Sequence, residues 1–537
     1  MSKSCGFEIV KRFCAIFALS AAIVITACSS DSSDNGAANS FSGVSIGGSS
    51  SLVPSGTLNL TASAKTTGSV SVSYEWNVTD GAELSATTGN SVTLTAGSTE
   101  TAVTVTLTGK ATVDGAEITK TASKEITISA SANSISASDT PTGYATITPQ
   151  TGSGTTVTTK AELLSAISNG GLIYVSGTID MSDGCLPTTA GGTTDELDAF
   201  VKKQTTSLKN SDSSKYPNVY TTYTAFRNAY AALCSSSTDD KSSSSTSTTL
   251  SQTLWKLNST YGNKIKLNVK SNTTIIGLGN AVIKGGTIQI SGVSNVTIRN
   301  LTIQDAYDPF PHHEKDDGFN AQWDGIAVLN SSKNIWIDHC TIEDTMKYTT
   351  VTTSSGSEKW QTYDGLCDIT KSSTNVVVSY CFFKNHDKTM LIGSSSSDLS
   401  GGNITIHHNR FLNCGQRLPM TCYPNMHIYN NSYERDSDAY YSQQACIAAR
   451  YGAYTIIAEN NYFGSGVQYC ISQSTSPSGK CYESGNVFTS RSEGSKALST
   501  QDTKPFTPSY EYTLDNASDI PTILIENAGA DVWSVQK

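Results

Sequence analysis

One nine-residue pattern recurs six times in this chain, and it constrains the fold more than any other feature of the sequence. Apolar residues alternate within each copy, which is the period of a β-strand, and the copies start 39, 41, 28, 22 and 29 residues apart. The copies are Asn295-Val-Thr-Ile-Arg-Asn-Leu-Thr-Ile303, Asn334-Ile-Trp-Ile-Asp-His-Cys-Thr-Ile342, Asn375-Val-Val-Val-Ser-Tyr-Cys-Phe-Phe383, Asn403-Ile-Thr-Ile-His-His-Asn-Arg-Phe411, Asn425-Met-His-Ile-Tyr-Asn-Asn-Ser-Tyr433 and Tyr454-Thr-Ile-Ile-Ala-Glu-Asn-Asn-Tyr462. Repeats of this length cannot bury a hydrophobic face alone, so they must stack as a solenoid. The sequence therefore predicts an all-β fold built on a parallel β-helix.

The seventh position of the pattern predicts a ladder inside this helix. Its occupants are Leu301, Cys340, Cys381, Asn409, Asn431 and Asn460. Stacked coils would place these small side chains over one another at one turn. The spacing between copies varies because loops of different length are inserted, and such loops usually build a binding face.

The first 28 residues are typical of a bacterial lipoprotein signal peptide. Lys11 and Arg12 precede an apolar run over 13–25 that is too short to span a membrane, and small residues lead to Cys28. We expect Cys28 to carry lipid, residues 29–42 to form a flexible tether, and the protein to be an outer-membrane lipoprotein of the cell envelope, exposed at the surface. The alternative is an ordinary signal peptide with an incidental cysteine.

Cysteines downstream of that signal permit disulfides. Ten remain once Cys5, Cys14 and Cys28 are set aside, and an even number in an exported protein is compatible with pairing. The favoured pairs are Cys470 with Cys481 and Cys185 with Cys234. The two ladder cysteines are either bonded to each other or packed as small buried thiols.

Residues 43–130 predict a separate β-sandwich. The region is rich in Thr, Ser and Val, and its alternating segments are spaced like sandwich strands. Trp76 is the expected core anchor. The region resembles the immunoglobulin-like modules that bacteria place beside secreted catalytic domains, where it would serve as a spacer or bind glycan.

A second domain is expected over 143–537, after a linker over 131–140. Residues 159–167 have helical spacing and precede a short apolar strand, as a helix that caps one end of a solenoid would. Residues 181–262 form a polar insertion, and regular coils are expected to begin at 274–279.

Four charged residues fall on the same arm of successive coils. Counted back from the start of the next copy, Asp324 lies 10 residues before it, Asp364 and Asp368 lie 11 and 7 before it, and Arg417 lies 8 before it. Asp364 and Asp368 would share one face of a strand while Gly365 points inward. Strands stack about 4.8 Å apart, which would bring Asp324 beside the pair. Such carboxylates repel one another, and Ca²⁺ is the hard cation that oxygen ligands favour. The alternative is three separately solvated acids.

The net charge of −10 and the pI near 5.2 argue against a nucleic-acid partner. An acidic protein that handles an acidic polymer needs a cation between the two. The charge balance is therefore consistent with the same calcium hypothesis.

Six motifs carry a more specific signal because they occur together and in order. They are Trp336-Ile-Asp-His339, Asp364-Gly-Leu-Cys-Asp-Ile369, Asn385-His-Asp-Lys388, Leu391-Ile-Gly393, His407-His-Asn409 and Gln416-Arg-Leu-Pro419. From about Gly143 to its end the chain resembles the pectate lyases of polysaccharide lyase family 1. The resemblance implies a right-handed parallel β-helix.

The resemblance also implies a chemistry. The expected reaction is calcium-dependent cleavage of pectate, a (1,4)-α-D-galacturonan, by β-elimination to unsaturated oligogalacturonides. Asp324, Asp364 and Asp368 would hold Ca²⁺, Lys388 would grip a uronate carboxylate, and Arg417 would be the base. Arginine is protonated at neutral pH, which predicts an alkaline optimum. We expect a monomer.

One loop departs from the family pattern. Where the family continues Arg-x-Pro-Arg-x-Arg, this chain has Met420 and Cys422 in place of the second and third arginines. Two charge-assisted contacts to uronate carboxylates are therefore missing or come from elsewhere. Arg450 and Arg410 are the candidate substitutes.

Two rival functions remain open on the sequence. A pectin lyase that acts on methylated polymer would need no bridging cation, which the three aspartates argue against. A β-helix that binds acidic glycan without cutting it is favoured by the altered loop. The paired histidines, His312-His313 and His407-His408, do not predict a joint metal site, because neighbours on a strand point to opposite faces.

Overall fold

The protein is described by a computed structural model that covers residues 39–68, 70–129, 134–150, 152–241, 248–441, 445–453 and 455–536. The predicted signal peptide, Cys28 and most of the tether therefore lie outside the described residues. No helix within these ranges combines the length and hydrophobicity that a membrane span requires.

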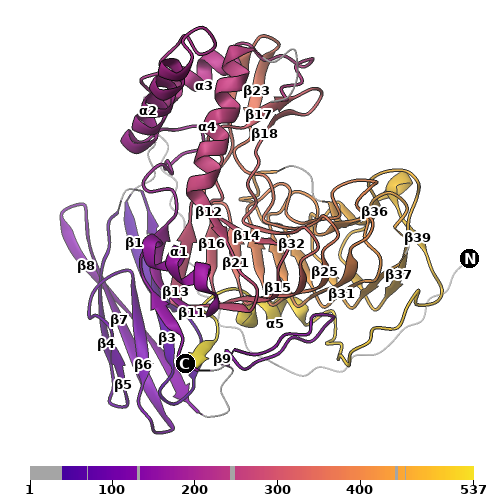
Figure 1. The fold of residues 1–537 in the computed structure, drawn as a ribbon. Coiled ribbons are helices and arrows are strands. Elements are labelled where there is room, and N and C mark those ends of the chain that lie inside the picture. Colours follow the sequence, from indigo (N-terminus) through magenta and orange to yellow (C-terminus); the bar gives the residue numbers. More distant parts are fainter. Residues whose placement is uncertain are drawn as a thin grey trace, which may run out of the picture.

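A parallel β-helix forms the body of the molecule, as predicted (Figure 1). Each regular coil contributes one long and one short strand to an 18-stranded sheet and one strand to an 8-stranded sheet. The larger sheet contains β10 (Thr155–Val157), β11 (Gly171–Asp180), β13 (Thr273–Lys284), β15 (Ser294–Arg299), β16 (Thr302–Gln304), β20 (Lys333–Asp338), β21 (Thr341–Glu343), β25 (Thr374–Ser379), β26 (Phe382–Lys384), β28 (Gly402–His407), β29 (Arg410–Leu412), β31 (Met426–Tyr429), β32 (Ser432–Glu434), β34 (Ile456–Glu459), β35 (Tyr462–Phe463), β37 (Lys480–Ser484), β38 (Val487–Phe488) and β39 (Ser499–Thr500).

The 8-stranded sheet faces the inserted loops. It contains, in spatial order, β12 (Lys266–Asn268), β14 (Thr287–Ser291), β19 (Ile326–Leu329), β24 (Cys367–Ile369), β27 (Leu391–Ile392), β30 (Met420–Thr421), β33 (Ala445–Ala449) and β36 (Tyr469–Gln473). All its pairings are parallel. Loops that precede these strands therefore lie side by side.

The repeated pattern folds into strand, turn and strand. Its sixth residue adopts a left-handed conformation in the first five copies, as at Asn300 (φ 50°) and His408 (φ 55°), and this turns the chain between the long and short strands. Asparagines at the seventh position form the predicted ladder: the Asn409 backbone N–H donates to Asn431 Oδ1 at 2.9 Å, and the Asn431 N–H donates to Asn461 Oδ1 at 3.0 Å. The ladder satisfies backbone groups that the turn would otherwise leave buried without partners.

The sixth copy is shifted by one residue from its predicted register. Ile456 pairs with Met426, so the copy starts at Thr455, and the ladder residue is Asn461 rather than Asn460. Asn460 is instead the left-handed turn residue (φ 48°). Two consecutive asparagines made the register ambiguous in the sequence.

Both predicted disulfides are wrong, because all ten cysteines of the described residues are free and buried. The ladder thiols Cys340 and Cys381 lie in the hydrophobic core of the β-helix and donate to backbone carbonyl oxygens, including Ile337 O for Cys381. They belong to a core whose coils also stack aromatic rings, with Phe383 and Phe411 at 5.0 Å between ring centroids.

Two sheets at the N-terminal end form the predicted sandwich around Trp76, which is 3% exposed. One sheet contains β1 (Ser40–Gly47), β3 (Thr57–Thr67), β5 (Ala82–Leu84), β6 (Ser91–Ala96), β9 (Ser134–Ser136) and β40 (Ser534–Gln536); the other contains β2 (Ser51–Leu52), β4 (Ser73–Val78), β7 (Thr101–Val113) and β8 (Ala116–Ile128). The first strand begins inside the expected tether, and β9 lies in the expected linker. β40 comes from the far end of the sequence and lies between β3 and β9.

Helices cap and flank the β-helix (Figure 1). Helix α1 (Lys160–Asn169) begins at a capping box in which Thr159 and Glu162 exchange hydrogen bonds, as expected for the solenoid cap. The insertion forms α2 (Asp195–Ser211), α3 (Tyr223–Ala231) and α4 (Thr249–Ile265). The remaining elements are the hairpins β17 (His312–Glu314) with β18 (Gly318–Asn320) and β22 (Thr349–Thr353) with β23 (Gly356–Trp360), helix α5 (Ile520–Asn527) and the 3-10 turn η1 (Gly494–Lys496).

The insertion has its own aromatic core, although the sequence suggested only a polar segment. Tyr223, Phe226 and Tyr261 are fully buried and pack with Phe310 and Trp360 from the hairpin region. Their ring centroids lie about 6 Å apart in edge-to-face pairs. The helices are therefore fixed to the body rather than tethered to it.

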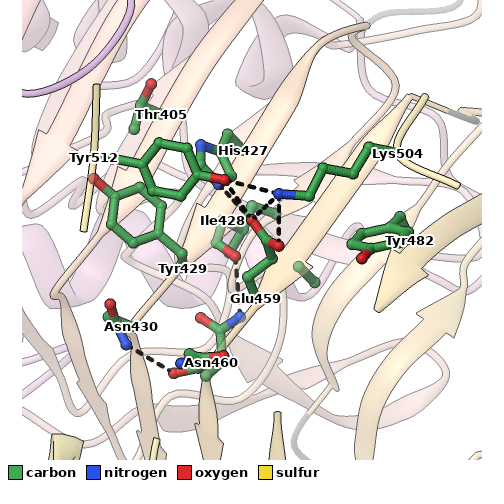
Figure 2. A network of polar contacts seen from close by, with 12 residues as sticks. Thr405, His427, Ile428, Tyr429, Asn430, Glu459, Asn460, Tyr482, Lys504 and Tyr512 are labelled. Atoms are coloured by element: carbon green, nitrogen blue, oxygen red, sulfur yellow. Dashed lines mark hydrogen bonds and ion pairs between the residues drawn. The ribbon is translucent and has the colours of Figure 1, made fainter. Parts of the chain in front are cut away.

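A charged cluster on the outer face of the larger sheet holds the C-terminal segment in place (Figure 2). Glu459 Oε2 accepts hydrogen bonds from Tyr512 Oη at 2.9 Å and from Lys504 Nζ. Lys504 Nζ also lies 2.8 Å from Glu459 Oε1. His427 Nε2 lies 3.3 Å from the same carboxylate, and His427 Nδ1 lies 2.7 Å from Tyr510 Oη. We call Glu459, His427, Lys504 and Tyr512 the Glu459 cluster.

Candidate active site

The predicted charged residues lie on consecutive strands of the 8-stranded sheet. Asp324 precedes β19, Asp364 and Asp368 flank the start of β24, Lys388 precedes β27, and Arg417 precedes β30. Backbone bridges join Gly365 to Lys388 and Lys388 to Gln416. The structure thus places these side chains on one stripe along the helix axis.

Gly365 does not point inward as predicted. A Cβ atom on Gly365 would lie 2.6 Å from Asp368 Oδ1 and 2.7 Å from Asp324 Oδ1, so the glycine is what lets the two carboxylates approach. The alternation slips here: the backbone N–H groups of Leu366 and Cys367 both donate to Thr389 O, and both side chains enter the core. The carboxylates share a face through this irregularity rather than through regular alternation.

The carboxylates of Asp324, Asp364 and Asp368, hereafter the carboxylate stripe, disfavour one another's charge. Burial and the charges of Asp368 and Asp364 raise the pKa of Asp324 well above its usual value. Burial raises the pKa of Asp368 to about 7, with Asp364 adding to the shift and Arg417 and Lys388 opposing it. Single hydrogen bonds from Gly365 N–H to Asp324 and from Leu391 N–H to Asp368 offset little of this.

Lys388 reaches into the stripe from the next coil. Its Nζ lies 3.0 Å from Asp364 Oδ1 and donates to Asn320 Oδ1 at 2.6 Å. Only 7% of Lys388 is exposed, so its ammonium group is held at the carboxylates. Asn320 was not found from the sequence, because it lies on a hairpin 68 residues before Lys388 and has no motif around it.

Arg417 combines two unusual features. Its backbone is left-handed (φ 62°), which is rare for a residue with a long side chain, and its Nε atom is buried without a hydrogen-bond partner among the described residues. Its charge lowers the pKa of Asp368, so the guanidinium lies close to the stripe. Strain and an unmet donor at a charged site are typical of functional positions.

Comparison with known proteins identifies the family. A sequence model described as pectate lyase matches residues 256–532, which is more than half of the chain and includes every residue of the stripe. This chain belongs to the pectate lyase family.

Individual pectate lyases agree with this assignment. A pectate lyase of Bacillus subtilis (strain 168) is 33% identical over 280 residues, which are 50% of this chain and 66% of that protein. Pectate lyase E of Dickeya chrysanthemi is 42% identical over 176 residues, which are 32% of this chain and 46% of that protein. The match thus spans about two thirds of the Bacillus protein and about half of the Dickeya protein.

Solved pectate lyases share the fold. A pectate lyase bound to a hexasaccharide is 28% identical with a TM-score of 0.53, and the match covers 70% of this chain and 92% of that one. A pectate lyase from Acidovorax avenae subsp citrulli has a TM-score of 0.58 at 23% identity, covering 74% of this chain and 96% of that one. The right-handed parallel β-helix expected from the family is thereby supported.

The loop that departs from the pectate lyase pattern is only partly open to a substrate. Met420 is half-buried and accepts a hydrogen bond from Ser474 Oγ to its sulfur at 3.5 Å. Cys422 is buried, and a Cβ on Gly393 would lie 2.2 Å from its sulfur. The prediction that both positions face the substrate is therefore wrong for Cys422, which packs into the core.

Of the two candidate substitutes, only Arg450 lies near this loop. Its backbone N–H donates to Thr421 O, and its Nη2 donates to Tyr451 Oη. Burial raises the pKa of Cys422 to about 11, and the charge of Arg450 opposes that rise. Arg410 lies on β29 of the other sheet and makes two hydrogen bonds to Glu434. Arg410 is therefore excluded from the site, and a substrate role for Arg450 stays a prediction.

A buried pair behind the stripe was also missed. His386 Nδ1 lies 2.6 Å from Asp344 Oδ2, and His386 Nε2 lies 2.9 Å from the backbone oxygen of Asp364. Burial alone would lower the pKa of His386, but Asp344 raises it above the usual value. The imidazole fixes the backbone that carries Asp364.

The paired histidines are structural. His312 contacts Glu314, and His313 contacts Glu358. The rings of His407 and His408 approach within 2.8 Å at their Nδ1 atoms, contrary to the expectation of opposite faces, because the left-handed turn at His408 interrupts the strand.

The carboxylate stripe fits a hard cation by its donor chemistry but does not enclose one. Its oxygens are the ligands that Ca²⁺ prefers, and a divalent cation would relieve the repulsion that helps to raise the pKa values of Asp324 and Asp368. Within the described part of the chain, no group of three or more His, Cys, Asp and Glu residues is arranged as a complete metal site. A cation there would need further oxygen ligands from solvent or substrate.

Proposed function

We propose that this chain cleaves de-esterified pectin, (1,4)-α-D-galacturonan, by β-elimination at the carboxylate stripe, with Ca²⁺ as cofactor. The observation that carries the proposal is the convergence of three carboxylates, Lys388 and Arg417 on consecutive strands in a member of the pectate lyase family. A polymer of uronate is the substrate that needs both a cation bridge and fixed ammonium and guanidinium groups.

The side chains divide the work of the reaction. Asp324, Asp364 and Asp368 would hold Ca²⁺, which would supply positive charge to stabilise the negative charge that develops beside C5 of the substrate. Lys388 is the ammonium group positioned to bind a uronate carboxylate, because it already rests against Asp364. Held in this way, the sugar presents its C5 proton to Arg417.

Arg417 then acts as the base. Its guanidine nitrogen takes the C5 proton, the electron pair of the C5–H bond forms the C4–C5 double bond, and the C4–O bond breaks with its pair leaving on the glycosidic oxygen. That oxygen gains a proton, which yields an unsaturated sugar and a new chain end. Arginine is protonated at neutral pH, so the rate should rise into the alkaline range.

The direct test is ultraviolet absorbance of polygalacturonate incubated with the protein. We expect absorbance from the unsaturated product in Ca²⁺ and none in excess chelator. Full activity in chelator on methylated pectin would favour a pectin lyase instead. Binding of polygalacturonate without any product would favour a non-catalytic glycan-binding β-helix, which the loss of arginines at Met420 and Cys422 makes the main rival.

We also propose that the protein is held at the cell envelope through lipid on Cys28, as a surface-exposed outer-membrane lipoprotein. The support is the sequence pattern of Lys11, Arg12 and the apolar run before Cys28. Cys28→Ala should move the protein from the membrane fraction to the soluble fraction. Complete protection from added protease in intact cells would reject surface exposure without affecting the lipid anchor.

A further inference from the structure

A second charged pocket lies beyond the stripe, between helix α4 and the first strands of the 8-stranded sheet. It has a volume of about 610 Å³. Three lysines and two tryptophans line it: Lys215, Lys256, Lys266, Trp255 and Trp323. The rest of the lining is Tyr216, amide side chains and one serine.

The charge of the pocket is opposite to that of the protein. The chain carries a net charge of −10, yet no aspartate or glutamate is among the residues that line the pocket. None of its three lysines forms an ion pair with any described residue. Three unpaired ammonium groups around one cavity repel one another, and an anionic ligand would relieve that repulsion.

Packing shows that the pocket wall is built rather than incidental. Lys266 Nζ lies 4.2 Å from the centre of the Trp323 ring, in a cation–π contact. The same ring presses so closely on α4 that a Cβ on Gly262 would lie 2.3 Å from Trp323 Cζ2. Gly262 lies in the last turn of α4, and the absence of a side chain there allows the Trp323 ring to pack against the helix and support Lys266.

The opposite wall offers a flat apolar surface. Trp255 on α4 is half-buried; its indole N–H donates to Asp240 O at 3.1 Å, and its ring centroid lies 4.7 Å from that of His312. The orientation of the ring is therefore fixed. Flat, fixed aromatic rings beside ammonium groups suit a sugar ring that carries a carboxylate.

The pocket lies along the same sheet as the carboxylate stripe. Trp323 directly precedes Asp324. Lys266 begins β12, which pairs with β14, and β14 pairs in turn with β19, the strand that follows Asp324. The strand that begins at Lys266 is therefore four strands from Lys388 along the sheet. At about 4.8 Å per strand this is about 19 Å, a distance that an extended uronate chain of several sugars would span.

We propose that this pocket is an additional subsite that binds carboxylates of the polymer several sugars away from the scissile bond, and that it gives the protein a preference for long substrates. The inference rests on the proposed function for the identity of the polymer. Independently of cleavage, the subsite predicts that the pocket lysines bind carboxylates of the polymer that are several sugars away from the carboxylate stripe.

The test compares two double variants with the same loss of charge. Lys215→Ala/Lys256→Ala removes two exposed lysines of the pocket; Lys202→Ala/Lys203→Ala removes two exposed lysines from α2 of the same insertion, neither of which lines the pocket. Turnover is measured on trigalacturonate and on polygalacturonate, and binding to polygalacturonate is measured separately in chelator by affinity electrophoresis at several salt concentrations. Methyl-esterified pectin is the uncharged control polymer.

We expect the pocket variant to lower the ratio of kcat/KM on polymer to kcat/KM on trimer about tenfold, to weaken binding of polygalacturonate by a similar factor, and to reduce its salt dependence. The α2 variant should match wild type.

Equal ratios and equal binding for the two variants would overturn the subsite even if wild type cleaves pectate. If wild type forms no unsaturated product but the pocket variant alone loses binding, the proposed function fails and the subsite stands. Equal weakening on methyl-esterified pectin would also overturn it.

Discussion

The Glu459 cluster and the carboxylate stripe use the same kinds of residue on opposite sides of one β-helix, with opposite results. Glu459 is 3% exposed and Asp368 is 8% exposed. Burial would raise the pKa of both, yet His427, Lys504 and Tyr512 lower that of Glu459 to about 2, whereas the pKa of Asp368 rises to about 7. The opposite charges and hydrogen-bond donors around Glu459 outweigh the effect of burial there, and those around Asp368 do not.

The charges of the Glu459 cluster are paired within the protein, whereas those of the carboxylate stripe are not fully paired. On the outer face each charged group meets an opposite charge, and the result is a fixed attachment for the C-terminal segment. On the 8-stranded sheet the carboxylates have too few partners, and Arg417 keeps a buried nitrogen without one among the described residues. Buried ionisable groups with too few partners are typical of functional sites.

The largest effect should follow from a change at Arg417, the proposed base. Arg417→Lys keeps the charge but loses the planar guanidinium and its position, so we expect turnover on polygalacturonate to fall at least about 1,000-fold. Circular dichroism should show an unchanged fold. Arg410→Lys is the matched control, because Arg410 is paired with Glu434 on the other sheet; a comparable loss of activity there would show that the effect is structural.

Removal of one carboxylate from the stripe should cost about 100-fold in turnover. Asp364→Ala leaves the substrate carboxylate poorly bridged and frees Lys388 from its present partner. The calcium concentration required for half-maximal activity should rise strongly, measured by product absorbance during a calcium titration. Wild-type activity in this variant at low calcium would remove the calcium mechanism.

The third change weakens the well-partnered side of the comparison. Glu459→Gln leaves Lys504 and His427 without their carboxylate, and we expect a loss of unfolding free energy on the order of 2 kcal/mol at pH 7. Because the folded pKa of Glu459 is depressed, its contribution is present above the unfolded value near 4.5 and disappears as pH falls towards 2. Urea unfolding of both proteins at several pH values measures this; activity per folded molecule should not change.

Asp368→Asn should have the opposite sign. The folded pKa of Asp368 is raised to about 7, so ionising this carboxylate costs stability that grows as pH rises from about 4 to above 7. Without calcium we expect the variant to be more stable than wild type at pH 8, by on the order of 1 kcal/mol because coupled carboxylates share the penalty, and equal to it below pH 4. Thermal unfolding in chelator provides the measurement. A less stable variant at pH 8 would contradict the proposed repulsion.

The smallest effect should come from the altered loop. Met420→Arg places a guanidinium at a half-buried position on β30, the strand that follows Arg417, and we expect affinity for polygalacturonate to increase a few-fold through one new carboxylate contact. Cys422→Arg should instead destabilise the protein, because its site in the core has no room beside Gly393. If both variants bound more tightly, the burial of Cys422 would not describe the protein in solution.

The repeats predicted the β-helix, and the position of each charge within a repeat predicted which side chains meet. Stacking makes equal positions in successive coils neighbours, so one periodicity determines both. Contacts that depend on non-repeating segments were not predictable in this way. Asn320 reaches Lys388 from a hairpin, and the aromatic core of α2, α3 and α4 is formed by residues scattered through an insertion that looks polar on average.

Local departures from the repeat were the other source of error. Regular alternation placed Gly365 inward, but the slip at Leu366 and Cys367 turned it towards the carboxylates. The same limit applies to Cys422: the family resemblance predicts an arginine at this position, and only packing shows that the cysteine has entered the core.

The position of β40 has a consequence for the order in which the protein can be completed. Thr57 in β3 pairs with Val535, and Asn59 bonds to Asp531 across 472 residues of sequence. N-terminal domains ordinarily fold first during synthesis, but this one cannot complete its sheet until a strand made hundreds of residues later has been delivered. The Thr57 end of β3 and the whole of β9 therefore lack this partner while the β-helix is synthesised, and a chain truncated before residue 534 would leave both without it.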